Sequence, residues 1–365
     1  MISAPRAASY DARMPASHRI AVIPGDGIGT EVVAVARQVL DAVSARHDLT
    51  LTYTELDWSC QRFLSEGAMM PADGLDTLSG HDAILLGAVG WPGVADHVSL
   101  WGLLIPIRRT FRQYVNLRPI RVFDGVESPL RGARAGEVDF VVVRENVEGE
   151  YSEVGGRVNR GFPDEQAVQE SIFTRAGVSR IADYAFELAA TRRGQVTSAT
   201  KSNGIVHTMP FWDEVVAERA AAHPGVRLDS EHIDALAAKF VLQPQRFDVV
   251  VASNLFGDIL SDLAAAVAGS IGIAPSANLD PTRTYPSMFE PVHGSAPDIA
   301  GTGVANPVGA VWSAALMLEH LGHPRAAADV VAAIESTLAD PATRTADLGG
   351  TAKTEQVAEA LLALI

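Results

Sequence analysis

Short runs of aliphatic residues, each closed by glycine or polar residues, constrain this chain most. The clearest runs lie at 20–23 (IAVI), 82–87 (DAILLG), 139–143 (DFVVV) and 248–252 (DVVVA). Apolar residues recur at helical spacing between such runs, for example over 178–189. Buried strands read as continuous apolar runs, and their alternation with helices is typical of layered α/β proteins. The sequence therefore predicts an α/β fold.

Composition narrows the class of protein further. A chain of 365 residues is longer than one typical domain of about 150 residues. With 47% hydrophobic and 20% charged residues, it is neither disordered nor collagen-like. The net charge of −15 argues against a nucleic-acid or anionic-membrane surface, and no apolar run is long enough to span a bilayer. The single cysteine, Cys60, excludes an internal disulfide and a cysteine-based zinc cluster.

The first eighteen residues are small and polar and lack the apolar core of a secretory signal. We therefore expect residues 1–18 to form a flexible tail, with the folded body beginning at Arg19. The expected location of the protein is the cytoplasm.

A glycine-rich turn at 24–29 (PGDGIG) follows the first apolar run and precedes a helical pattern at 30–40. Its spacing is G-x-G-x-G rather than the dinucleotide fingerprint G-x-G-x-x-G, and Asp26 would bring a negative charge to a pyrophosphate. The residues alone leave open a cofactor contact or a tight turn that needs positive φ. No Rossmann site is predicted here.

Two acidic residues stand at helical spacing after the 248–252 run. Asp258 and Asp262 are separated by four positions, so both carboxylates lie on one face of the predicted helix. Such like charges repel unless a cation lies between them, and oxygen ligands without thiols suit Mg²⁺ or Mn²⁺. The alternatives are a solvated helix face or a cap for the new helix.

Three arginines are candidates for binding an anionic substrate. Arg144 ends the 139–143 run, where α/β proteins place ligands, and Arg108 and Arg118 precede it. Together they can clamp a carboxylate-rich molecule, or they can form three separate surface salt bridges. Lys201 and Tyr151 are candidates for proton transfer, although an exposed lysine and a core tyrosine are the more usual cases.

Taken together, these segments resemble the isocitrate/isopropylmalate dehydrogenase family of metal-dependent β-decarboxylating dehydrogenases, from Arg19 to the C-terminus. The motifs that carry the resemblance are IPGDGIG (23–29), NLRP (116–119), VREN-x-EG (143–149), NLFGDILSD (254–262) and EPVHGSAPDIAG (290–301). The resemblance implies two α/β domains that share a mixed sheet and bind their cofactor without a Rossmann fold. Residues 1–112 and 268–365 would form the cofactor-binding domain, and residues 113–267 the substrate, metal and dimerisation domain.

The resemblance also implies a role for each candidate residue. In the family, three arginines hold the malate carboxylates, a tyrosine and a lysine form the acid–base pair, and three aspartates bind the metal. The matching positions are Arg108, Arg118 and Arg144, then Tyr151 and Lys201, then Asp234, Asp258 and Asp262. The family's lysine and first aspartate enter the site from the other subunit of a homodimer, which implies the same for Lys201 and Asp234.

The resemblance places the cofactor's adenosine on the loop that follows residue 290. The matching positions are His293, Gly294, Ser295, Ala296, Asp298 and Asn306. A carboxylate at Asp298 would bond a ribose 2′-hydroxyl and repel a 2′-phosphate, which favours NAD over NADP. The expected metal is Mn²⁺ or Mg²⁺, and the resemblance leaves a further K⁺ requirement open.

The segment 99–102 (SLWG) resembles the branch of the family that acts on tartrate and D-malate. An indole at Trp101, beside Leu104, would crowd out a bulky substituent and favour a small acid. Leu103 and Pro106 depart from the branch's pattern and leave 3-isopropylmalate or another 3-alkylmalate as the alternative substrate. Because proline does not fit deep inside a helix, we expect the helix that carries Arg108 to start at or near Pro106.

The expected activity is thus NAD- and metal-dependent oxidation and β-decarboxylation of a small 2-hydroxy dicarboxylate. D-malate, giving pyruvate and CO₂, and tartrate are the first candidate substrates. A catalytically silent relative that serves as a binding or regulatory subunit is the competing class. The loss of a site residue would indicate it, and none of the matching residues is missing.

Overall fold

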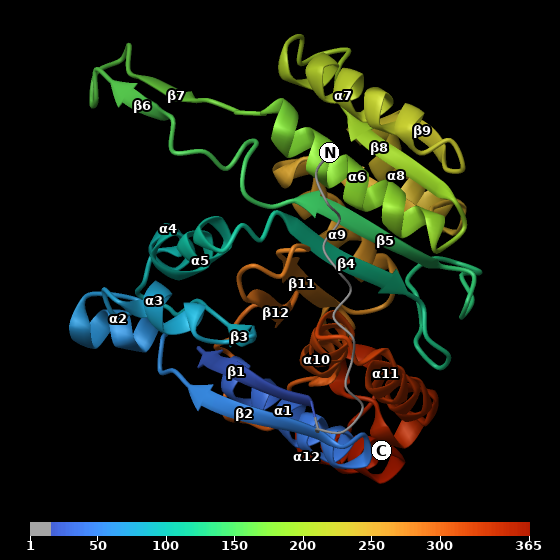
Figure 1. Cartoon of the computed structure of the whole chain (residues 1–365). Helices are drawn as coiled ribbons and strands as arrows, with labels where there is room; N and C mark the ends of the chain where they lie inside the picture. The colour runs from blue at the N-terminus through green and yellow to red at the C-terminus, as the bar shows by residue number, and fades with distance from the viewer. Residues whose placement is uncertain (1–15) are drawn as a thin grey trace.

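The computed structural model describes residues 16–365, which are built around one ten-stranded mixed sheet (Figure 1). The strand order is β2-β1-β3-β12-β11-β4-β5-β10-β8-β9. The strands are β1 (Ala16–Gly25), β2 (Leu49–Glu55), β3 (Ala83–Ala88), β4 (Val115–Arg121), β5 (Asp139–Glu145), β8 (Gln195–Thr200), β9 (Arg227–His232), β10 (Val249–Ala252), β11 (Pro275–Leu279) and β12 (Ser287–Pro291). Both the α/β class and the mixed sheet were predicted from the sequence, and both are confirmed.

The sheet consists of two parallel blocks that run in opposite directions. Strands β2, β1, β3 and β12 form one block, and β5, β10, β8 and β9 form the other. Strands β11 and β4 join the blocks by antiparallel pairing. In this register Arg144 on β5 lies opposite Asn116 on β4, and Asn116 lies opposite Asn278 on β11. Residues paired in this way point to the same face of the sheet.

Helices cover both faces of the sheet. They are α1 (Gly29–Arg46), α2 (Cys60–Glu66), α3 (Gly74–Ser79), α4 (Asp96–Ser99), α5 (Ile105–Thr110), α6 (Arg175–Ala190), α7 (Thr208–Ala222), α8 (Ile233–Leu242), α9 (Asn254–Val267), α10 (Val308–His320), α11 (Pro324–Ala339) and α12 (Thr354–Leu364). A π-helical turn, Leu100–Leu104, joins α4 to α5. On β4, Leu117 faces α6 and α10, whereas Arg118 faces α9. The polar face of β4 is therefore the face that α9 covers.

The alternation along β1 explains why its apolar run is continuous. Ile20 and Val22 pack into the larger core, which also holds the buried side of α1. Ala21 and Ile23 point to the other face, into a smaller core that contains Ile107 of α5. A strand buried on both faces needs apolar residues at every position.

The predicted tail is wrong for its last three residues. Strand β1 begins at Ala16, and Ala16 pairs with Leu49 of β2. Backbone pairing, rather than apolar side chains, orders this segment, so its composition carried no signal. The rest of the predicted tail, residues 1–15, lies outside the described residues. None of the helices between Ala16 and Ile365 is both long and apolar enough to cross a bilayer.

A hairpin of β6 (Gly155–Val158) and β7 (Gln166–Gln169) projects from the body as a separate two-stranded sheet (Figure 1). All residues of its two strands are exposed, including the large apolar side chains of Val158 and Val168. An isolated two-stranded hairpin is only marginally stable in water.

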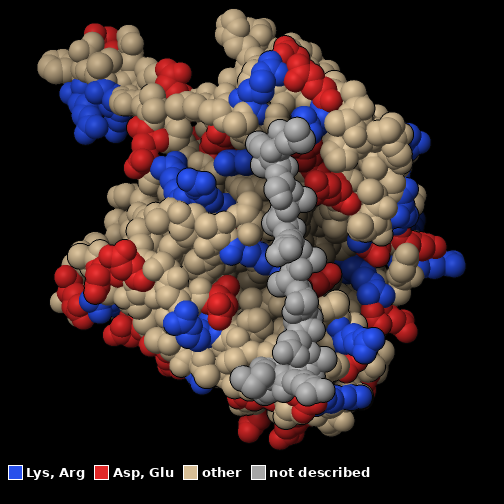
Figure 2. Space-filling view, viewed as in Figure 1, with Lys and Arg blue, Asp and Glu red and all other residues tan. Residues whose placement is uncertain are grey.

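On the face seen in Figure 2, acidic and basic side chains are interspersed.

Candidate active site

The three predicted substrate arginines converge on one buried site. Arg108 comes from α5, Arg118 from β4 and Arg144 from the end of β5, and their exposed fractions are 8%, 8% and 2%. They are therefore not three surface salt bridges. Burial lowers the pKa of Arg144 to about 10; nearby Asp258 opposes this shift, and the charges of Arg118 and Arg108 add to it. So dense a positive charge suits a ligand that carries more than one carboxylate.

Two aspartates from α9 face the arginines. Arg144 forms an ion pair with Asp258, and Arg118 Nη1 lies 3.1 Å from Asp262 Oδ1. Burial by itself would raise the pKa of Asp258, but the charges of Arg144 and Arg118 outweigh it and hold the pKa below its usual value. For Asp262 burial prevails and the pKa is raised, against the opposing charge of Arg118. The predicted face with two carboxylates exists, and it lies against the arginines.

Tyr151 joins this cluster from the loop after β5. Its hydroxyl donates a 2.8 Å hydrogen bond to Asp258 Oδ2, and the guanidinium of Arg144 lies 5.6 Å from its ring centre. Burial and the bond to Asp258 raise the pKa of Tyr151 to about 12. The phenol therefore keeps its proton at neutral pH and can act as a proton donor.

The other predicted acid–base and metal residues lie apart within the chain. Lys201, after β8, forms a 2.7 Å ion pair with Asp234 in the first turn of α8. That hydrogen bond lowers the pKa of Asp234, which is exposed. Within residues 16–365, no hydrogen bond or ion pair joins this pair to Asp258 or Asp262, and no group of three His, Cys, Asp or Glu side chains is placed to hold a metal ion. A single chain therefore gathers two of the three predicted ligands.

The donor chemistry of those two ligands still suits a hard cation. Both carboxylates approach one point, since Asp262 and Asp258 lie 3.1 and 3.7 Å from the Arg118 guanidinium. They offer oxygen and no sulfur, as Mg²⁺ and Mn²⁺ prefer. The residues present fit such an ion, with further oxygens to come from substrate, water or a second chain.

The segment with Trp101 and Leu104 forms the π-helical turn before α5. Both side chains are half-buried, and Ile105 N–H donates to Leu100 O across five residues. Helix α5 begins at Ile105, beside Pro106 as expected, although the chain is already helical upstream. Pro106 cannot donate the next bond, so it fits where the wide π turn changes to an α turn. Leu103 is fully buried in the smaller core.

The predicted cofactor residues lie on the loop after β12. His293 is buried; its Nδ1 lies 2.9 Å from Gly294 O, and its Nε2 has no partner. Burial lowers the pKa of His293, so the ring is neutral at physiological pH.

The other predicted cofactor residues differ in burial. Asn306 donates to Asp347 over 3.0 Å, and Asp298 is exposed. Ser295 is buried, and Ala296 has a φ of 38°. The unpartnered His293 nitrogen fits a loop that awaits a polar ligand.

The glycine-rich turn supports this loop. Ile28 N–H donates to Ser295 O over 2.8 Å, and Gly301 N–H donates to Glu31 over 2.6 Å. A Cβ at Gly27, which has a φ of 56°, would lie 2.0 Å from Ser295 O. The tight turn with positive φ, one of the two interpretations left open by the residues, is therefore present. Asp26 points inward and accepts from the amides of Cys60 and Gly90, so its charge does not face a phosphate.

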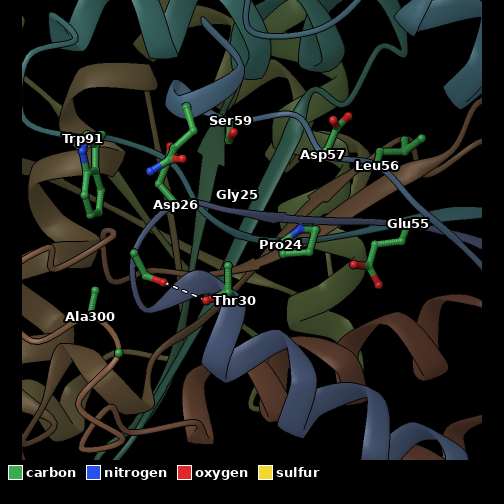
Figure 3. A pocket seen from close by; sticks show the side chains of 13 residues that line it. Pro24, Gly25, Asp26, Thr30, Glu55, Leu56, Asp57, Ser59, Trp91 and Ala300 are labelled. Atoms are coloured by element: carbon green, nitrogen blue, oxygen red, sulfur yellow. Dashed lines mark hydrogen bonds between the residues drawn. The ribbon is translucent and has the colours of Figure 1, made fainter. Parts of the chain in front are cut away.

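A pocket of about 680 Å³ opens beside the turn (Figure 3). Thr30 donates to Gly27 O at its floor, and Trp91 and Ala300 stand on one side. Its lining residues, all in the described part of the chain, include acidic Glu55 and Asp57 and no Lys or Arg. The pocket therefore offers no side-chain cation to a phosphate.

A family model described as isocitrate/isopropylmalate dehydrogenase matches residues 19–361. The chain belongs to the isocitrate/isopropylmalate dehydrogenase family. It is 56% identical over 355 residues to a D-malate dehydrogenase (decarboxylating) of Escherichia coli (strain K12), covering 95% of this chain and 98% of that protein. It is 56% identical over 358 residues to a tartrate dehydrogenase/decarboxylase of Pseudomonas putida, with coverages of 95% and 98%. A crystal structure of an isocitrate dehydrogenase from Methylococcus capsulatus superposes with a TM-score of 0.85 at 34% identity, covering 95% and 99%.

Membership of the isocitrate/isopropylmalate dehydrogenase family makes the chain an oxidoreductase and confirms the predicted family. Sequence reasoning nevertheless missed the residues that hold the arginines in place. Arg118 Nε donates to Asn116, Asn116 donates to Asn278, and Asn278 donates to Glu290, over 2.8, 3.0 and 2.7 Å. Arg108 donates to the same Glu290 oxygen over 2.7 Å.

This buried chain of hydrogen bonds, from Arg118 to Arg108, is called the polar relay below. Asn116 and Glu290 stand inside recognised motifs, but their sequence context does not show that they meet. The only signal at Asn278 is an amide within a short buried strand whose other polar residue is Ser276, and buried polar side chains need partners.

Proposed function

We propose that this protein oxidises and decarboxylates a small 2-hydroxy dicarboxylate with NAD and a divalent metal, with D-malate, giving pyruvate and CO₂, as the first candidate and tartrate as the second. The observation that carries the proposal is the buried trio of Arg108, Arg118 and Arg144 facing Asp258 and Asp262. The names of the two relatives from Escherichia coli and Pseudomonas putida support this substrate class.

The chain's own side chains would divide the work. The three arginines bind and orient the two carboxylates, which suits the planar fork of the guanidinium. Lys201 takes the proton of the 2-hydroxyl, and Tyr151 returns a proton to the carbon that loses CO₂. Bound NAD would supply the hydride acceptor, and a divalent ion on Asp258, Asp262 and Asp234 would supply Lewis-acid stabilisation of negative charge on the substrate oxygens.

Two features support a small substrate over a 3-alkylmalate. Leu103 packs in the core, so it does not enlarge or line the site. Pro106 marks the change from π to α helix, which is a structural role. Both departures from the expected pattern thus have explanations away from the substrate. Trp101 and Leu104 remain as the half-buried side chains that would limit a substituent.

A homodimer is the second part of the proposal, with Lys201 and Asp234 completing the site of the other copy. Within the described residues of one chain, the side chains of Lys201 and Asp234 pair only with each other. The projecting β6–β7 hairpin supports the same assembly, because a second copy could pair with it and cover its apolar side chains.

The proposed cofactor site is the loop from His293 to Asp298 together with Asn306, and the exposed Asp298 supports NAD over NADP.

We also propose two domains, one formed by residues 1–112 and 268–365 and the other by residues 113–267. The position of the boundaries supports this division. One falls between α5 and β4, and the other follows α9. We place the reaction in the cytoplasm, where NAD-linked oxidation of small acids is expected.

The test is formation of NADH from D-malate, meso-tartrate and 3-isopropylmalate, each with and without Mn²⁺. Metal-dependent NADH formation with D-malate or tartrate well above that with 3-isopropylmalate is the expected result. A clear preference for 3-isopropylmalate would make that acid the substrate in place of D-malate and tartrate. No NADH formation with any of the three acids would refute the proposed function. Asp258→Asn should abolish the Mn²⁺ dependence, and an unchanged dependence would remove the metal assignment.

A further inference from the structure

Arg109 follows Arg108 but makes a separate set of contacts. Its Nη2 donates to the backbone carbonyl of Tyr151 over 2.7 Å, and its Nη1 lies 3.0 Å from Glu153 Oε2. Its guanidinium carbon also lies 5.0 Å from the ring centre of Trp101. One side chain therefore touches the residue expected to limit the substrate's size and the residue expected to donate the proton.

These contacts continue directly into the arginine cluster. The Tyr151 hydroxyl is bound to Asp258, and its ring lies under Arg144. Trp101 is thus connected through Arg109 and Tyr151 to the carboxylate and guanidinium that face the substrate. A planar guanidinium can stack on an indole and donate in its own plane at the same time, which an ammonium group cannot do.

The elements joined in this way are far apart in the sequence. Arg109 and Trp101 belong to the helical segment 96–110, whereas Tyr151 and Glu153 lie on the loop that leads to the β6–β7 hairpin. Glu153 is largely exposed, so its ion pair contributes little. The indole and the backbone carbonyl are the contacts that position the site.

We propose that Arg109 is a positioning residue that determines substrate selectivity, because it fixes the Trp101 indole relative to Tyr151 across the substrate site. The inference rests on the proposed function and deepens it. Without the guanidinium, the indole can swing away from Tyr151, so the site admits a larger substituent and protonates a small substrate less well.

The experiment compares Arg109→Gln and Arg109→Lys with wild type on D-malate and 3-isopropylmalate. We expect Arg109→Gln to lower kcat with D-malate about tenfold or more, an effect of the size of one lost charge-assisted hydrogen bond. The ratio of kcat/KM for D-malate to that for 3-isopropylmalate should fall by a similar factor, while the KM for NAD stays unchanged. Arg109→Lys should lie between, because it keeps the charge and loses the planar fork.

Two matched controls separate this role from a general loss of charge. Glu153→Gln removes only the exposed ion pair, and Arg112→Gln removes an exposed arginine three residues further along. Both should keep the D-malate rate and the selectivity ratio within about twofold of wild type. A ratio that stays unchanged in Arg109→Gln, while wild type oxidises D-malate, would overturn the inference.

A second measurement does not depend on activity. The Tm values of wild type, Arg109→Gln, Trp101→Leu and the double variant form a double-mutant cycle. If the two side chains are in direct contact, the decrease in Tm of the double variant is smaller than the sum of the decreases in the two single variants. Strictly additive losses would also overturn the inference. If wild type forms no NADH with any of the three acids, the proposed function is refuted instead. The double-mutant cycle in Tm then decides whether Arg109 holds the indole.

Discussion

The two halves of the proposed catalytic machinery differ sharply in how the chain supports them. Arg144 is 2% exposed and is bound to Asn254 and Asp258, and Asp258 in turn is bound to Tyr151. The Asp234 side chain is 68% exposed, and its side-chain partner is Lys201. The arginine half is tied into the core of the chain, whereas the other half is a single ion pair between the exposed Asp234 and the partly buried Lys201.

This difference indicates where each half is expected to act. Burying a charge is costly unless other groups of the same chain compensate it, so the arginine cluster needs its aspartates and its polar relay. An exposed ion pair adds little stability, so the fold of one chain does not require Lys201 and Asp234 to meet. A site shared between two copies would leave this contrast in a single chain.

The strongest test of the contrast is complementation between two inactive variants. Tyr151→Phe and Lys201→Ala should each lower kcat with D-malate by about 10²- to 10⁴-fold, the usual contribution of a proton-transfer group. In a mixed dimer, a shared site leaves one of the two sites intact. Co-expression of the two variants should therefore restore about one quarter of wild-type activity for random pairing in a two-fold dimer.

The control for that test is a pair of variants from the buried half. Tyr151→Phe mixed with Asp258→Asn should restore nothing, because each site of the mixed dimer then carries one defect. If Tyr151→Phe and Lys201→Ala also restore no activity although mixed dimers form, both residues act within one chain. The difference in burial between the two halves would then not indicate a shared site.

A smaller effect is expected at the substrate end of the buried half. Trp101→Ala removes the indole that would limit the substituent at the substrate's third carbon. The kcat/KM for 3-isopropylmalate relative to D-malate should rise about 10- to 100-fold, since filling or opening an apolar pocket changes discrimination by about 1–3 kcal/mol. Trp91→Ala is the matched control, because Trp91 lines the pocket in Figure 3 instead. An equal change in both variants would exclude Trp101 as the selecting residue.

The buried half also shows what sequence reasoning can reach. The strands at 139–143 and 248–252 are visible as apolar runs, and the carboxylates of Asp258 and Asp262 follow from helical spacing. Such features depend on neighbours in the sequence. The family resemblance added the roles of residues whose own context is unremarkable, such as Lys201 and Asp234.

The polar relay could not be predicted in the same way. The relay forms because β11 runs antiparallel between β4 and β12, which brings together Asn116, Asn278 and Glu290. Local periodicity in the sequence predicts neither the order nor the register of those strands. The π-helical turn at Leu100–Leu104 was missed because its residues also suit an α-helix. The inward position of Asp26 was not predicted, because its partners, the amides of Cys60 and Gly90, come from other elements.

The relay itself can be tested by removing its charge. Glu290→Gln would leave the buried Arg108 with a weaker partner, so Arg108 would be held less firmly for the substrate carboxylate. The KM for D-malate should rise about tenfold, in line with the value of a hydrogen bond to a charged group. Glu319→Gln, on an exposed position of α10, is the control and should leave KM unchanged. A KM near the wild-type value in Glu290→Gln would show that Arg108 is positioned by other contacts.

The last expected effect concerns stability rather than catalysis, at Glu145, the buried neighbour of Arg144. Its Oε1 accepts from the amides of Asn146, Val147 and Glu148, and its Oε2 has no partner. Burial raises the pKa of Glu145 to about 7. Between its unfolded pKa of 4.5 and about 7, the folded chain therefore holds a proton that the unfolded chain has released.

The stability contributed by Glu145 is thus present below pH 4.5 and is lost as the pH rises toward 7. Its slope approaches about 1.4 kcal/mol per pH unit within that window. Urea unfolding at several pH values should show wild type losing stability relative to Glu145→Gln, which cannot ionise, whereas Glu137→Gln at an exposed position should run parallel to wild type. Parallel curves for wild type and Glu145→Gln would mean that Glu145 ionises normally, and that the buried half tolerates one more negative charge beside its arginines.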